Sequence, residues 1–78
     1  MRNTREFKVF TRKAESTLSI YGEAKAIGLT PSSVENFINS FTKLNEEADE
    51  YVLIISRDEE IRTSLKNRFE EALSELKG

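Results

Sequence analysis

Basic and aromatic side chains interleave in the first third of the chain, in a pattern that could bind nucleic acid. Cationic side chains can neutralise phosphates, and aromatic rings can stack on unpaired bases. The candidate residues are Arg5, Lys8, Phe10, Arg12, Lys13, Tyr21 and Lys25. In an alternative interpretation Phe10 is an edge or dimer contact, and the basic side chains only keep a small protein in solution.

A second candidate surface is acidic. Residues 46–60 contain seven carboxylates and a single cation, Arg57. A basic protein could recognise such a surface. The candidate residues are Glu46, Glu47, Asp49, Glu50 and Asp58. Their spacing matches no EF-hand loop and lacks its glycine, so no metal site is predicted. Alternatively, the acidic residues after Arg57 only stabilise the first turn of a helix.

A third candidate lies in residues 23–43, which have the Ala, Gly and Val spacing of a helix-turn-helix. Gly28 would make the turn, and the second helix would enter the major groove of DNA. The groove-facing residues would be Ser32, Ser33, Asn36, Asn39 and Lys43. Only one of them is cationic, which weakens the phosphate contacts that DNA binding needs. The alternative is a strand that leads into a capped helix.

Composition argues against catalysis. The 78 residues contain no His and no Cys, which removes the commonest general base and metal ligand and every thiol nucleophile. We therefore expect neither an enzyme nor a cofactor. The length predicts one domain, residues 1–78, with residues 1–4 frayed. No apolar run is long enough for a membrane span, which predicts a soluble cytoplasmic protein.

The second half of the chain predicts a strand and a helix. Residues 51–55, Tyr-Val-Leu-Ile-Ile, form a continuous apolar run that is rich in β-branched residues and typical of a buried strand. Ser56 with Glu59 three residues later is typical of a capping box. The helix that follows carries an apolar face at spacings of three and four: Ile61, Leu65, Phe69, Ala72, Leu73 and Leu76.

The first half predicts two strands and a helix. Residues 5–12 and 18–25 alternate with period two, which predicts a β-hairpin with a turn at residues 14–16 and a bulge at Gly22. A helix then starts after Gly28, capped by Thr30 or Ser32, and ends near Asn45. The predicted fold class is therefore α+β, in the order ββαβα. Two helices would pack on one face of a three-stranded sheet.

Two segments carry a resemblance to a known family. Residues 41–54, Phe-Thr-Lys-Leu-Asn-Glu-Glu-Ala-Asp-Glu-Tyr-Val-Leu-Ile, and residues 67–69, Asn-Arg-Phe, resemble the Alba family of archaeal chromatin and RNA-binding proteins. The resemblance implies the order helix, strand, helix. The family's lysine-bearing loop corresponds here to residues 28–31, which have no Lys, and from its second basic loop only Arg57 carries over.

These patterns give three hypotheses of function. The first is a non-enzymatic nucleic-acid-binding module, for DNA or RNA, that uses the basic and aromatic hairpin. The second is a small protein-binding regulator or inhibitor, of the phage or plasmid type, that binds a basic partner through residues 46–60. The third is the helix-turn-helix regulator. We also expect a homodimer, formed through a sheet edge or the outer sheet face.

Overall fold

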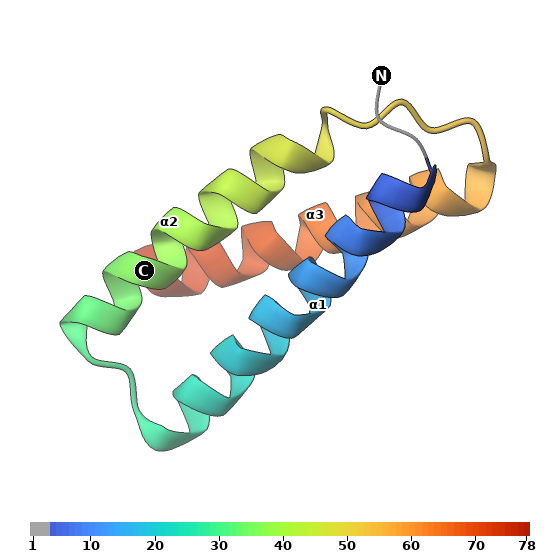
Figure 1. Ribbon diagram of the computed structural model, residues 1–78. Helices are drawn as coiled ribbons and strands as arrows, with labels where there is room; N and C mark the ends of the chain where they lie inside the picture. The colour runs from blue at the N-terminus through green and yellow to red at the C-terminus, as the bar shows by residue number, and fades with distance from the viewer. Residues whose placement is uncertain (1–3) are drawn as a thin grey trace.

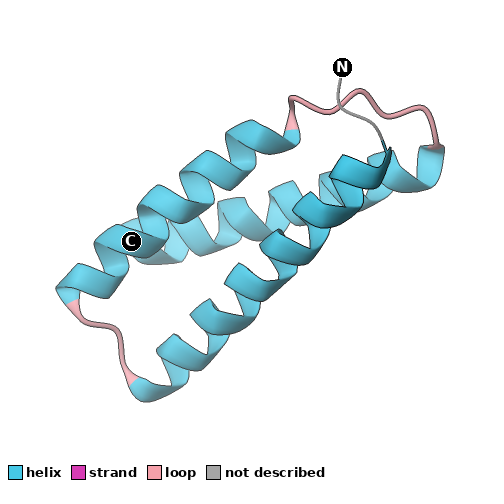
Figure 2. Cartoon of the chain, in the orientation of Figure 1, coloured by secondary structure: helices cyan, strands magenta, loops and turns pink. Residues whose placement is uncertain are grey.

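The computed structural model describes residues 4–78 and shows three helices: α1 (Thr4–Ile27), α2 (Pro31–Ala48) and α3 (Ser56–Lys77). Figure 1 shows α1 and α2 running antiparallel, with α3 packed behind both. The bundle is elongated, with principal extents of 39 × 18 × 18 Å. No strand is formed within residues 4–78 (Figure 2), and none of these helices is long and apolar enough to cross a membrane.

The predicted α+β class and ββαβα order are therefore wrong, and the protein is all-α over the described residues. Of residues 1–4, predicted to fray, Thr4 begins α1 and residues 1–3 lie outside the described part. The sheet edge and outer sheet face expected to mediate a homodimer do not exist in residues 4–78.

The predicted N-terminal hairpin is a single helix, α1. Phe7, Phe10, Ala14 and Tyr21 are all buried, and they recur at helical spacings along one side of this element. The period-two alternation is coincidental, because residues 14–16, Ala-Glu-Ser, contain no glycine, proline or asparagine to turn the chain. Gly22 is an exposed helical residue rather than a bulge.

The second helix forms where it was predicted and is longer by one turn. Thr30 is its N-cap, since its Oγ1 accepts a hydrogen bond from the Ser33 amide at 3.1 Å, and Pro31 occupies the first turn. Between α1 and α2 the chain turns at Gly28, whose φ of 120° suits glycine. Phe41, Leu44 and Ala48 are buried.

The predicted strand at residues 51–55 is instead the connection between α2 and α3. It has no partner strand because the hairpin that should flank it is helical. The predicted capping box is also wrong: Ile55 is the N-cap of α3, without a side-chain cap, and Ser56 is already helical. The helical stripe itself is confirmed, with Leu65, Phe69 and Ala72 buried and its other members partly buried.

Aromatic rings fill the core from end to end. Near the start of α1, Tyr51 packs against Phe7 and Phe10, with ring centroids 5.5 and 5.2 Å away. Further along, Phe41 lies 5.3 Å from Tyr21 and 5.9 Å from Phe69. Rings of this size bury much apolar surface per residue, which a 78-residue chain needs in order to be stable.

Candidate interaction site at the connection between α2 and α3

The connection consists of residues 49–55 and joins two helix ends at one end of the bundle (Figure 1). It opens with a turn, in which the amides of Asp49 and Glu50 donate to the carbonyls of Glu46 and Glu47 at 3.2 and 3.0 Å. It closes at Ile55, whose carbonyl accepts from two amides of the first turn of α3. Residues 51–54 between these points belong to neither helix nor strand.

Two side chains hold the connection against the bundle. Tyr51 is 4% exposed, packs in the aromatic core and donates its hydroxyl to Glu47 Oε2 at 3.1 Å. Arg62 of α3 donates to the carbonyl oxygens of Ala48 at 3.1 Å and Tyr51 at 2.7 Å. The guanidinium therefore ties the end of α2 and the start of the connection to α3.

Three aliphatic side chains of the connection are exposed to solvent. Ile54 is 91% exposed, Val52 56% and Ile55 50%. Leu53, between them, packs against the core. Residues 51–54 thus alternate inward and outward as a strand would, whereas Ile55 is exposed like the residue before it. The apolar run was visible in the sequence, but it was predicted to be a buried strand, whereas three of its side chains are exposed.

The acidic candidates differ in their exposure and in their contacts. Glu46 and Glu50 are exposed. Glu47 and Asp49 are engaged within the bundle, in ion pairs with Lys13 at 2.9 Å and Lys66 at 2.5 Å. Asp58 is half-buried, with its Oδ2 enclosed. Glu46, Asp49 and Glu50 are therefore the members of the predicted set whose side chains reach the surface.

The basic candidates lie on α1 and not on a hairpin. Phe10 is 1% exposed and Tyr21 4%, so neither ring is open for base stacking in this structure. Arg5, Lys8 and Arg12 are exposed. Lys8 and Arg12 line a hollow between the starts of α1 and α3, with Ile55 on its other side.

Two other basic candidates are held in ion pairs. Lys13 binds Glu47, and Lys25 binds Glu75 at 3.1 Å while its ammonium lies 4.7 Å from the centroid of the Tyr21 ring. The Tyr21 hydroxyl donates to the same Glu75 at 2.7 Å. This hydrogen bond, together with Lys25, lowers the pKa of Glu75. The hypothesis of a hairpin that binds nucleic acid is wrong, because the hairpin is absent and its two candidate stacking rings are part of the core.

The helix-turn-helix hypothesis predicted two helices joined by a turn at Gly28, and the structure has them. Residues 23–27 are helical, and Gly28 separates them from α2, on which Ser32, Asn36, Asn39 and Lys43 are exposed and Ser33 is half-buried. However, α1 and α2 lie antiparallel as a helical hairpin (Figure 1), whereas a helix-turn-helix crosses its helices at a steep angle.

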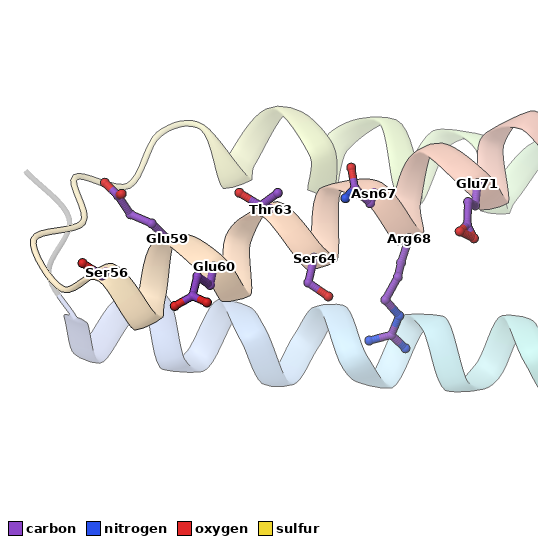
Figure 3. A pocket seen from close by; sticks show the side chains of 8 residues that line it. All are labelled: Ser56, Glu59, Glu60, Thr63, Ser64, Asn67, Arg68 and Glu71. Atoms are coloured by element: carbon purple, nitrogen blue, oxygen red, sulfur yellow. The ribbon is translucent and has the colours of Figure 1, made fainter.

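The outer side of α3 carries a shallow polar groove. Figure 3 shows its lining: Ser56, Glu59, Glu60, Thr63, Ser64, Asn67, Arg68 and Glu71. Arg68 points toward α1, where it pairs with Glu15 at 2.6 Å. No group of three or more potential metal ligands occurs within residues 4–78. The lining has hydroxyls but no neighbouring histidine, so we read it as a solvated helix face.

No family model, curated protein or solved structure matches this chain. The similarity of residues 41–54 and 67–69 to the Alba family stays a prediction. Any inference of function therefore rests on the geometry of the bundle and its surface.

Proposed function

We propose that this protein is a small protein-binding regulator, and that its partner binds the connection between α2 and α3. The observation that carries the proposal is the 91% exposure of Ile54, together with the exposure of Val52 and Ile55. When a partner covers clustered aliphatic side chains on a surface, their removal from water makes the free energy of binding more favourable.

The anchoring of the connection supports the same proposal. Tyr51 is buried, Leu53 packs on the core, and Arg62 holds the backbone at the carbonyl of Tyr51. A segment held in this way loses little conformational entropy when it binds, so more of the contact energy appears as affinity. The exposed side chains are thus presented by a supported backbone.

The charge around the connection indicates the chemistry of the partner. Glu46 and Glu50 lie exposed on one side, and Glu59 lies in the first turn of α3 on the other (Figure 3). Lys8, Arg12 and Arg57 lie beside Ile55, so carboxylates do not surround the whole connection. A complementary surface would have an apolar pocket with Lys and Arg side chains placed to face the three carboxylates. We infer a basic protein as partner. A cytoplasmic location stays a prediction.

The test compares three tagged forms of the protein in cells of its native host. One is the natural sequence, and one carries Val52→Ser and Ile54→Ser. The control carries Asn36→Ser and Asn39→Ser, which change two exposed positions on α2. We expect one protein to co-purify in stoichiometric amount with the natural and control forms and not with the connection variant.

The recovered partner is then purified and its binding measured against salt. Glu46→Gln with Glu50→Gln should weaken binding by about tenfold and flatten the salt dependence. Retention of the same partner by the connection variant would overturn the proposal, as would recovery of nucleic acid in place of a protein.

A further inference from the structure

The solvent side of α1 carries a stripe of six exposed positions, separated alternately by four and three residues. They are Val9, Lys13, Ser16, Ile20, Glu23 and Ile27. Val9 is 60% exposed, Ile20 54% and Ile27 88%. Alternate spacings of four and three form a straight seam along a helix, which is the pattern that helices use to pack together. Within residues 4–78 no other element covers this seam.

The order of residues in the stripe is self-complementary. Val9 and Ile27 lie at equal distances on either side of residue 18, and so do Lys13 and Glu23. The remaining pair, Ser16 and Ile20, is centred on the same residue. A second α1 laid antiparallel across the stripe would therefore place Val9 against Ile27 and Lys13 against Glu23. At the centre it would place the aliphatic Ile20 against the small side chain of Ser16.

We propose that the stripe binds a second copy of this chain, so that the two α1 helices form an antiparallel pair about a two-fold axis near residue 18. The dimer contains each facing pair twice, as an isologous interface requires. Val9 packs against Ile27 of the partner at both ends of the pair. Lys13 faces Glu23 of the partner, and Ile20 packs over Ser16 of the partner at the centre.

Charge excludes the parallel arrangement. In a parallel pair Lys13 would face Lys13 and Glu23 would face Glu23, which places like charges in contact. Lys13 already binds Glu47 at 2.9 Å, but its side chain remains 55% exposed and an ammonium has three donors. It can therefore hold Glu47 within its own chain and Glu23 across the interface.

The proposal does not depend on the proposed function. The stripe lies on α1, whereas the proposed partner surface is the connection between α2 and α3. The seam between Val9 and Ile27 extends over about 27 Å at the helical rise of 1.5 Å per residue. One helix pair of this length is a small interface, so the dimer should dissociate on dilution.

The first experiment measures molar mass by sedimentation equilibrium over a concentration series. The natural chain should rise from 9.0 kDa toward twice that mass as its concentration increases. Ile20→Glu should keep the mass of the monomer, and Glu23→Lys should raise the dissociation constant about tenfold. Ser40→Glu and Glu35→Lys, at exposed positions on α2, are the matched controls and should dimerise like the natural chain. Circular dichroism establishes that each variant is folded.

The second experiment fixes the orientation. Because the chain has no cysteine, single substitutions supply the only thiols. Ser16→Cys and Ile20→Cys, mixed under mild oxidation, should give the mixed disulfide faster than either symmetric one, since these positions face each other in the antiparallel pair. A monomer mass at every concentration would overturn the proposal. So would dimerisation unaffected by Ile20→Glu, or a predominance of symmetric disulfides in the mixture.

Discussion

The guanidinium of Arg62 donates to the carbonyl oxygen of Tyr51 at 2.7 Å, and the same nitrogen donates to the carbonyl of Ala48 at 3.1 Å. The connection has no sheet to satisfy its backbone, so a side chain from the next helix does so. Because Arg62 is partly buried, its bonds are shielded from water and from salt.

Replacing Arg62 with Met should therefore destabilise the bundle. The variant keeps the aliphatic part of the side chain but leaves two carbonyls without their donor, at a cost of about 1.5–3 kcal/mol. Arg57→Met, at an exposed position on the same helix, should cost less than about 0.5 kcal/mol. Urea unfolding of both variants checks this. If the two variants lost the same free energy of unfolding, the hydrogen bonds of Arg62 would contribute nothing beyond its helix propensity.

Sequence periodicity predicted α2 and α3 because their apolar residues fit one period only. Val34, Phe37, Phe41 and Leu44 fit a helix and cannot alternate across a sheet. In the first helix both periods fit, since Phe7 and Tyr21 are compatible with either. Local propensity could not decide between them. Packing does, because Phe7, Phe10 and Tyr21 reach the core together only when residues 4–27 form one helix.

The exposed connection shows a second limit of sequence interpretation. The apolar run of residues 51–55 is rich in β-branched residues and favours an extended backbone, and all five residues are outside both helices and strands. A strand, however, needs a neighbour. Because the residues of the predicted hairpin form the first helix, no neighbouring strand exists within residues 4–78. The side chains of Val52, Ile54 and Ile55 are therefore exposed on the surface. The acidic residues of the candidate site were found by composition, whereas its aliphatic residues required the fold.

Tyr21 should make stability depend on pH in alkaline solution. Burial, and then the hydrogen bond and charge of Glu75, raise the pKa of Tyr21 from 10.0 to about 12. Since the folded pKa lies above the unfolded one, the stabilisation is complete below pH 10 and is lost as the pH rises through 12.

The Tyr21→Phe variant tests this dependence. It keeps the ring but cannot titrate, so its stability relative to the natural chain should improve as the pH rises from about 10 to 12. Urea unfolding midpoints of both chains over this range give the difference, in which the titration of other groups cancels. A constant difference would show that the phenol is not stabilised in its neutral form.

Phe41 is fully buried at the centre of the aromatic core, and its removal should lower the free energy of unfolding of the whole bundle. Phe41→Ala should cost about 3–5 kcal/mol. Domains of this size have total stabilities of roughly 4–12 kcal/mol, so the loss is a large share of the whole. Thermal unfolding followed by circular dichroism measures it. Asn39→Ala, exposed on the same helix, should change little, and similar melting of the two variants would contradict the assigned core.

Two glycines should respond in opposite directions to the same substitution. Gly28 has a φ of 120°, so Gly28→Ala forces a side chain into a strained backbone and should cost about 1–2 kcal/mol. Gly22 is an exposed residue inside α1, and a Cβ added there meets nothing within 4 Å. Gly22→Ala should therefore stabilise the protein by about 0.5–1 kcal/mol through helix propensity. Urea unfolding of the two variants distinguishes a helix from a hairpin at Gly22. If Gly22 lay in a hairpin bulge, its replacement by Ala would lower the free energy of unfolding. Destabilisation by Gly22→Ala would count against a continuous first helix.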